Sequence, residues 1–490
     1  MAKLPPLWRD YDGLGQIASP PGHTTLLASP HLYPFLSRLP VLLVSGLSNF
    51  GHLSSLHLRI NRWVALNDAG VFLLIAIQQL LLVFALAFLT VTCAKRPILR
   101  CVIVVLLLCN PVLFVGAQFV SSEALGSTLL IFLIAIAVEF SRREHLTRNC
   151  LLALGLCLYF AIMTRHVAMI YTVLMPLTFL LATIARLKSP NARRTHFIKF
   201  LITCAIGLSA IVAANLTTRT LCFVLREPYR SVVARTAISR LDLIDRMPVP
   251  EKERYLQALQ NEASDPITKE AIPAVLAEKK YWGGSMLAIE KIILRDGSQL
   301  KSAERYALED HYLSEICRLY YRSLPAVALA DIQDAIVHGL IRTTPTEVLS
   351  FLYRNAEDSL DLYRSIPGFR KLTAHLRSCS LEAQATIRQA KNIWWLRGMD
   401  NNIPCGIELG VIVLLAGILR CFRAFKSESL YLLIVLGITN TLVMISTFAL
   451  TPYIARYVLP TCVMTAAALA IFAGGIKHRS LSLPSHLRPT

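Results

Sequence analysis

The chain has 490 residues, of which 54% are hydrophobic and only 17% are charged, and its mean hydropathy is +0.53. Because a soluble globular chain carries about 25% charged residues, this composition excludes an ordinary soluble protein. The formal net charge of +19 would suit a nucleic acid as partner. The basic residues mostly lie in short loops between apolar runs, however, which a bilayer explains and a nucleic acid does not.

The first predicted segment, residues 1–69, precedes every long apolar run and includes an amphipathic piece near Phe50–Leu66 that we expect at the membrane interface. Six apolar runs follow in residues 70–216. Each is interpreted as a transmembrane helix, since about 20 helical residues cross a bilayer core of about 30 Å. The runs are Gly70–Cys93, Val102–Phe119, Ala124–Phe140, Cys150–Thr164, Val167–Ala185 and Phe200–Leu216.

Residues 217–404 are predicted to form an inserted extramembrane domain, because Leu225–Asp400 is dense in charged residues. At about 190 residues the segment is large enough for its own core. Apolar residues recur there with helical spacing, and Pro248 and Pro345 mark helix boundaries, so we expect a mainly helical domain. The twelve cysteines of the chain show no spacing typical of a metal site. Three of them lie in this domain, where one pair is a disulfide candidate: Cys222, Cys317 and Cys379.

Three further apolar runs occupy residues 405–476, and a basic tail, residues 477–490, follows. The runs are Cys405–Arg420, Leu430–Leu450 and Tyr457–Ile476. The predicted fold class is therefore all-α: a polytopic bundle of about nine transmembrane helices with an inserted, mainly helical extramembrane domain.

Basic residues in the short loops predict the orientation. They form five clusters, at residues 95–100, 142–148, 186–194, 420–426 and 477–488. Nine crossings put all five on one side, as the positive-inside rule requires, whereas omitting the short run Cys150–Thr164 would separate the second cluster from the third. We expect that side to be cytoplasmic, in a multi-pass protein of the cell membrane, so residues 1–69 and 217–404 are expected outside.

An external start conflicts with the sequence of residues 1–69, which contain no signal peptide and only the short apolar run Leu39–Leu47. A tail with Lys3, Arg9 and further arginines should not cross a membrane unaided. We therefore expect an upstream span before the given start. The alternative is an N-out tail that the first span translocates.

Carboxylates on the external face are the first candidates for chemistry. Asp10 and Asp12 could supply a general base for an attacking hydroxyl, and the alternative is a solvated loop. Glu123 follows two serines at the outer end of a run. A carboxylate at a membrane boundary is costly unless it is hydrated or paired, and the alternative here is hydration combined with capping of the helix.

Two external cations run against the charge bias. Arg165 and His166 lie between two runs, and Arg456 and Tyr457 enter the last run. The planar guanidinium fork of an arginine suits phosphate oxygens. The two arginines, their neighbours His166 and Tyr457, and Glu123 are therefore the candidate substrate-binding residues. The alternative is that the arginines snorkel to lipid headgroups.

In order and sidedness these motifs resemble those of the GT-C glycosyltransferases, specifically the bacterial relatives of protein O-mannosyltransferases and aminoarabinose transferases. That family has an acidic catalytic residue in its first external loop, often followed by a proline-bearing segment similar to Ser29–Leu36. A Ser-Glu like Ser122-Glu123 opens a middle span, and an Arg-Tyr-x-x-Pro like Arg456–Pro460 closes the fold. The chain departs from the pattern where Tyr11 separates two acids that are adjacent in the family.

The resemblance implies transfer of a sugar from a polyprenyl-phosphate carrier to an acceptor hydroxyl or amine outside the bacterial inner membrane. Asp10 or Asp12 would deprotonate the acceptor, while Arg456, with Arg165, would hold the carrier phosphate, and Glu123 could orient the sugar. The partners would be the lipid bilayer, the polyprenyl-phosphate-linked sugar and an unidentified acceptor. Neither a metal nor another cofactor is expected, and no nucleic acid.

Two other functions stay open. A transporter or flippase for lipid-linked substrates would be expected to have repeat symmetry or paired Gly/Pro-broken spans, and the sequence shows no such pairing. A non-catalytic membrane scaffold would bind a partner through its external domain. In that case Asp10 and Asp12 would both be dispensable.

Overall fold

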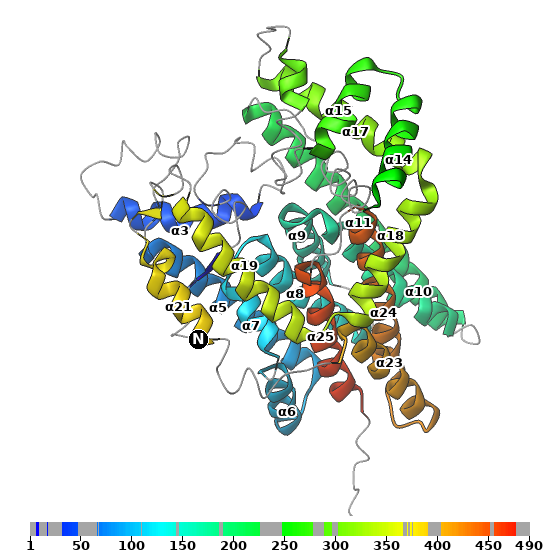
Figure 1. Ribbon diagram of the computed structural model, residues 1–490. Coiled ribbons are helices and arrows are strands. Elements are labelled where there is room, and N and C mark those ends of the chain that lie inside the picture. The colour runs from blue at the N-terminus through cyan, green and yellow to red at the C-terminus, as the bar shows by residue number, and fades with distance from the viewer. Residues whose placement is uncertain are drawn as a thin grey trace, which may run out of the picture.

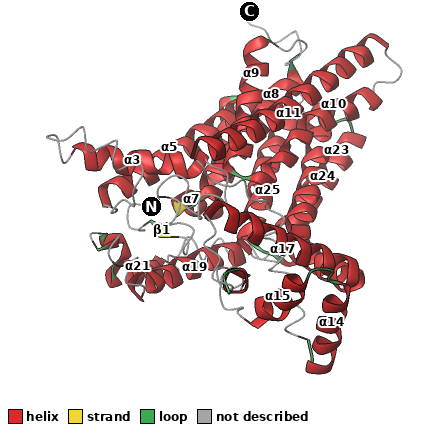
Figure 2. Ribbon diagram, turned by 90° about the horizontal axis from the view of Figure 1, so that it is seen from above, coloured by secondary structure: helices red, strands yellow, loops and turns green. Residues whose placement is uncertain are grey.

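The computed structural model describes residues 6–8, 17, 32–47, 66, 68–108, 110–143, 147–185, 190–225, 247–277, 289–295, 302–365, 370, 373–374, 376–390, 403–450 and 455–476. Within these ranges almost every element is a helix. Helices lie side by side in a bundle, with the described helices of residues 249–390 packed beside it (Figures 1 and 2). The described elements agree with the predicted all-α class.

The helices of the bundle are α5 (Asp68–Cys93), α6 (Pro97–Leu108), α7 (Pro111–Gln118), α8 (Ser122–Arg142), α9 (Arg148–Thr164), α10 (Leu174–Ala185), α11 (Pro190–Leu225), α23 (Cys405–Cys421), α24 (Ser427–Leu450) and α25 (Leu459–Gly475), with the 3-10 helices η1 (His166–Val173) and η5 (Ala455–Val458) before α10 and α25. The other described elements are β1 (Leu7–Trp8), α3 (Leu32–Leu47), β2 (Phe119–Val120), α14 (Val249–Glu262), α15 (Pro266–Ala277), α17 (Ser302–Ser323), α18 (Pro325–Val337), the π-helical η3 (His338–Arg342), α19 (Pro345–Ser365), η4 (Arg377–Cys379) and α21 (Leu381–Ala390).

Six of the described helical segments are long and apolar enough to cross a membrane, and up to eight if each of two bent pairs counts as one span. The six are α5, α8, η1 with α10, α11, α24, and η5 with α25; the bent pairs are α6 with α7, at 60°, and α17 with α18, at 96°. α9 and α23, where two further spans are predicted, have 17 residues each, or about 25 Å of helix. The bundle is compatible with a multi-pass membrane protein, and the number of nine spans is not confirmed.

The break between α6 and α7 has a local cause. The Asn110 side chain caps α7 by accepting a hydrogen bond from the Val112 backbone N–H at 3.2 Å. Pro111 at the first helical position has no N–H to donate and holds φ near its helical value. The predicted run Val102–Phe119 is therefore two helices that meet at an angle, followed by the short strand β2.

α25 is the most deeply buried of the candidate spans. Its apolar stretch is 89% buried, against 28–61% for the other five, and it packs against α5, α6, α8, α23 and α24. At its end a Cβ on Gly474 would overlap the Cys93 carbonyl oxygen, and one on Gly475 would overlap the Phe425 ring. Close approach of the neighbouring segments therefore requires glycine at both positions.

The described part of residues 217–404 contributes to two cores. α14, α15 and α17 surround a separate cluster that includes Leu259, Leu313 and Tyr320. α19 instead buries Val348, Leu352 and other residues in the core shared with the bundle. The helix boundaries predicted at Pro248 and Pro345 are confirmed at the starts of α14 and α19. The described cysteines form no disulfide, so the pairing predicted among Cys222, Cys317 and Cys379 is not found.

A carboxylate joins the inserted segment to the bundle. Asp68, the first residue of α5, accepts hydrogen bonds from the backbone N–H groups of Arg377 at 2.8 Å and Ser378 at 3.1 Å. A negative charge there also interacts favourably with the N-terminal end of the α5 helix dipole. η4 is thus held at the end of α5 at which residues 1–69 enter the bundle.

The predicted interfacial piece near Phe50–Leu66 lies outside the described residues, apart from its last residue, Leu66. The described helix before it is α3, which packs against α5, α8 and α9. Phe35, Leu39 and Leu43 recur every four residues on α3 and are exposed. An exposed apolar stripe with this spacing suits a helix that lies at a membrane surface.

The predicted orientation can be tested by cysteine labelling in intact cells, in a variant without the native cysteines. Ser264 lies between α14 and α15, and Thr195 lies near the basic end of α11; both are exposed. We expect a membrane-impermeant maleimide to label the Ser264→Cys variant and not the Thr195→Cys variant until the cells are permeabilised. The opposite pattern would reverse the proposed sidedness of the whole chain.

Candidate functional site

Glu123 lies at a junction of strand and helix. β2 pairs in parallel with β1, which places Trp8 opposite Val120, and the chain then turns into α8. Ser121 caps α8: its Oγ accepts a hydrogen bond from the Glu123 backbone N–H at 3.4 Å and donates to the Glu123 carboxylate. The Glu123 side chain is 1% exposed. The helix N-terminus favours its negative charge, but that alone does not offset such deep burial.

Two arginines from other parts of the chain meet this carboxylate. Arg165 Nη2 lies 3.7 Å from Glu123 Oε1, and Arg456 Nε lies 3.9 Å from the same oxygen. Arg165 is the C-cap residue of α9, and Arg456 belongs to η5, directly before α25. The three side chains, called the Glu123–Arg165–Arg456 cluster below, were separate candidates in the sequence, and the structure brings them together.

The cluster is buried and carries an excess of positive charge. The arginine side chains are 19% and 8% exposed. Counted over these three described side chains alone, two guanidinium groups and one carboxylate have a formal charge of +1. Both ion-pair distances exceed the roughly 2.7–2.9 Å of a direct charge-assisted hydrogen bond, so the contacts are electrostatic rather than a closed bidentate fork. Such an arrangement can accept a further anion.

The neighbours of the cluster help to position its arginines. Gly126 lies one turn after Glu123 on α8, and a Cβ there would come within 3.1 Å of Arg165 Cδ. The Tyr457 ring lies 5.2 Å from the Arg456 guanidinium carbon, in a cation–π contact. His166 opens η1 and is partly buried. Of the five predicted substrate-binding residues, three thus form the cluster and two are sequence neighbours of its arginines.

The two predicted catalytic residues, Asp10 and Asp12, lie outside the described residues. The strand before them is described: Trp8 is fully buried, pairs with Val120, and its ring packs edge-on against Tyr363 of α19 at 5.8 Å between centroids. α19 also packs against α7 and η5. One helix of the inserted segment therefore contacts both the strand that leads to Asp10 and the segment that carries Arg456.

Two buried hydrogen-bond donors, one on α19 and one on the strand packed against it, were not singled out in the sequence. The Trp8 Nε1–H and the Tyr353 hydroxyl are buried with no hydrogen-bond partner among the described residues. Burial raises the pKa of Tyr353 to about 12, so its hydroxyl stays protonated at neutral pH. Leaving a buried donor without a partner costs about 1–3 kcal/mol. A polar ligand could satisfy donors of this kind.

No group of three or more His, Cys, Asp or Glu side chains in the described ranges could hold a metal ion. Comparisons of the chain with protein-family models, curated proteins and solved structures found nothing that matches.

Proposed function

We propose that the chain is a membrane glycosyltransferase of the GT-C type with nine transmembrane helices. It would move a sugar from a polyprenyl-phosphate donor to an acceptor on the external face of the cell membrane. The observation that carries the proposal is the Glu123–Arg165–Arg456 cluster. It combines burial, an excess positive charge and a place at the ends of three bundle segments. Those properties suit the phosphate of a lipid carrier whose tail lies in the bilayer.

The arginines would act on the leaving group. When the acceptor oxygen or nitrogen attacks the anomeric carbon, the bond from that carbon to the phosphate oxygen breaks, and the phosphate leaves with the electron pair. Arg456 and Arg165 would stabilise the charge that develops on it. Glu123 keeps the two guanidinium groups together in the unliganded protein, and could orient the sugar once the phosphate is bound.

The proton of the acceptor would go to Asp10 or Asp12. Support comes from the described strand before them, because Trp8 pairs with Val120, three residues before Glu123. Asp10 follows Trp8 by only two residues in the sequence. The buried donors on Trp8 and Tyr353 would hydrogen-bond to hydroxyl groups of the sugar or the acceptor.

A flippase for the same lipid-linked substrate is the second candidate, and one observation favours it. The bent pair α6 and α7 is a broken helix of the kind that lines transport paths, and α7 leads directly into the cluster through β2. Sealed vesicles that contain the purified protein distinguish the two functions. Movement of an intact labelled lipid-linked sugar across the bilayer supports the flippase, whereas cleavage of the sugar–phosphate bond supports the transferase.

The test of the cluster is its affinity for a polyprenyl phosphate in detergent. We expect Arg456→Ala to weaken binding about 10- to 100-fold, because a hydrogen bond to a charged group contributes about 1.5–3 kcal/mol. Arg456→Lys keeps the charge but loses the planar fork, and should also bind more weakly. Arg322, whose side chain is 84% exposed, supplies the matched control, Arg322→Ala. Equal affinities in all four proteins would reduce Arg456 to an interfacial anchor and remove the main support for the transferase.

A further inference from the structure

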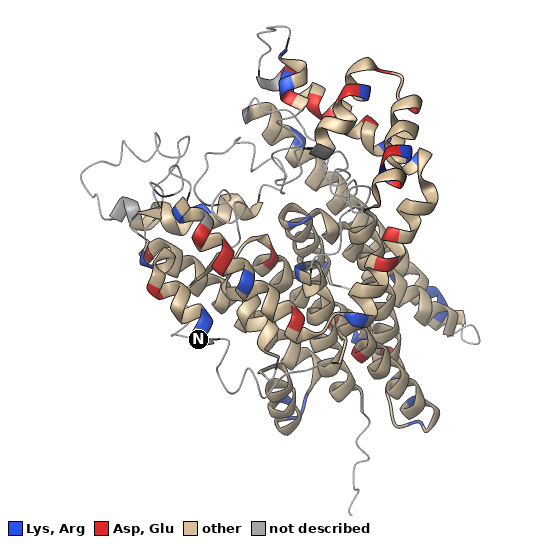
Figure 3. Cartoon of the chain, in the orientation of Figure 1, with Lys and Arg blue, Asp and Glu red and all other residues tan. Residues whose placement is uncertain are grey.

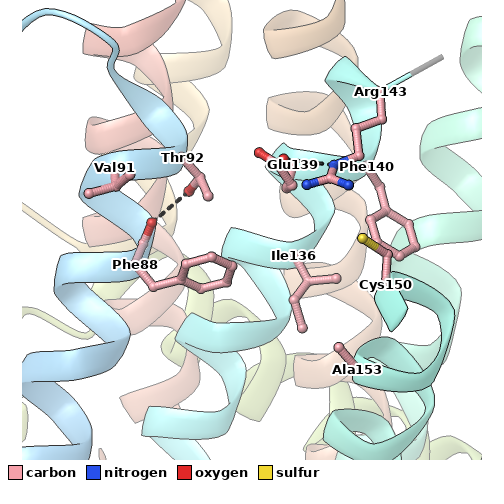
Figure 4. Close-up of a pocket in the computed structure, with 9 residues that line it drawn as sticks. All are labelled: Phe88, Val91, Thr92, Ile136, Glu139, Phe140, Arg143, Cys150 and Ala153. Atoms are coloured by element: carbon pink, nitrogen blue, oxygen red, sulfur yellow. Dashed lines mark hydrogen bonds and ion pairs between the residues drawn. The ribbon is translucent and has the colours of Figure 1, made fainter. Parts of the chain in front are cut away.

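A pocket of about 270 Å³ lies between α5, α8 and α9 (Figure 4). Its residues come from the last turns of α5 and α8 and the first turns of α9, so it lies at the basic end of the bundle, one helix length from Glu123 along α8. Phe88, Val91, Ile136 and Phe140 form apolar walls. Apolar walls of this kind hold ordered water poorly.

The mouth of the pocket is polar. Glu139 and Arg143 line it and form an ion pair of 2.8 Å through Arg143 Nε. Both side chains are partly exposed, at 31% and 41%. Arg143 ends α8 just where the basic loop between α8 and α9 begins. The pocket therefore combines an apolar interior with a charged rim, as an amphipathic ligand requires.

Further cations surround this rim. Arg142 donates hydrogen bonds to the carbonyl oxygens of Thr92 and Cys93, at 2.8 Å for Cys93, where α5 ends. Lys199 Nζ donates to the Arg143 carbonyl oxygen at 2.5 Å. Among the described side chains around this rim, three are basic (Arg142, Arg143 and Lys199) and one is acidic (Glu139). An anionic headgroup complements these basic side chains.

We propose that this pocket binds an acidic glycerophospholipid of the leaflet at the basic end of the bundle. One acyl chain lies between Phe88, Ile136 and Phe140, and the phosphate lies against Arg143 and Lys199. The positive-inside rule assigns this end to the cytoplasmic leaflet, which carries the anionic lipids. The site is separate from the cluster at Glu123 and does not depend on the transferase proposal.

Cys150 provides a reporter, because it lines the same pocket and is partly buried. In the delipidated full chain, with the other cysteines replaced, the rate of Cys150 alkylation by a small maleimide reports occupancy. We expect phosphatidylglycerol to slow alkylation at a lower concentration than phosphatidylcholine with the same acyl chains. Each basic residue near a membrane surface contributes about a fivefold preference, so Arg143→Gln should reduce the difference by about that factor.

Two controls make the test specific. Arg96 lies at the same end of the bundle, is exposed and is outside the pocket, so Arg96→Gln should keep the full preference. Ala153→Phe fills the pocket and should make the alkylation rate independent of lipid. Equal protection by both lipids, the same preference in Arg143→Gln as in the unaltered chain, or protection by inorganic phosphate alone would each overturn the proposal.

Discussion

Replacing Glu123 with glutamine is expected to lower the free energy of unfolding by about 3–5 kcal/mol, since removing one partner of a buried ion pair leaves charge without compensation. Here two guanidinium groups would be left together, at 19% and 8% exposure. Because Arg165 is partly solvated, the lower end of the range is the better expectation. Denaturant unfolding of the detergent-solubilised full chain measures the change.

Glu139 offers a matched control on the same helix. It also pairs with an arginine, but its side chain is 31% exposed, and exposed pairs contribute about 0–1 kcal/mol. Glu139→Gln should therefore change stability little. The double variant Glu123→Gln, Arg456→Gln should recover part of the loss, because it also removes one of the two guanidinium charges that the Glu123 carboxylate faces. Similar, small effects of Glu123→Gln and Glu139→Gln would mean that the cluster is hydrated rather than buried.

Replacement of the proposed catalytic base is expected to have the largest effect on the rate of sugar transfer. Asp→Asn keeps the size of the side chain and removes its basicity, and loss of a general base typically costs about 10²- to 10⁴-fold. We expect Asp10→Asn or Asp12→Asn to slow single-turnover transfer by such a factor. Affinity for polyprenyl phosphate should stay unchanged, since the arginines are intact. The variant that slows transfer identifies the base.

An exposed carboxylate controls for the loss of charge. Asp334 on α18 is 74% exposed, and Asp334→Asn should transfer at the unaltered rate. Full transfer activity in the double variant Asp10→Asn, Asp12→Asn would place the base elsewhere. Binding of the carrier would still be judged from Arg456, so the two parts of the proposed function can fail independently.

The residues of the candidate site could be recognised from the sequence, but it could not be predicted that they lie close together. Glu123, Arg165 and Arg456 are each out of place in an apolar or sparsely basic context, and that signal is local. Arg165 and Arg456 meet at one oxygen of Glu123 because of how α8, α9 and α25 pack. No spacing in the sequence encodes that packing. The contribution of Gly126 follows only from that packing.

For the rest of the fold, too, local features could be predicted from the sequence and features that depend on packing could not. Long apolar runs predicted the helices of the bundle, because their length and composition are local properties. The strand pair of Leu7–Trp8 with Phe119–Val120 was missed, since two residues are too few to show a period. Pro111 was visible in its run, but the 60° bend between α6 and α7 depends on the helices around them. The helical spacing of apolar residues in α19 predicted a helix. It did not indicate that this helix would pack against the bundle.

The deep burial of α25 has a consequence for biogenesis. α25 follows all the other described helices in sequence, and its hydropathy of 1.8 is the lowest among the six candidate spans. Because a chain is made from its N-terminus, α5, α8 and α24 reach the membrane before the helix that fills the space between them. Arg456 directly precedes that helix. Until the helix packs into the bundle, the cluster therefore contains only Glu123 and Arg165. A chain released before residue 455 would therefore lack the helix that fills the space between α5, α8 and α24.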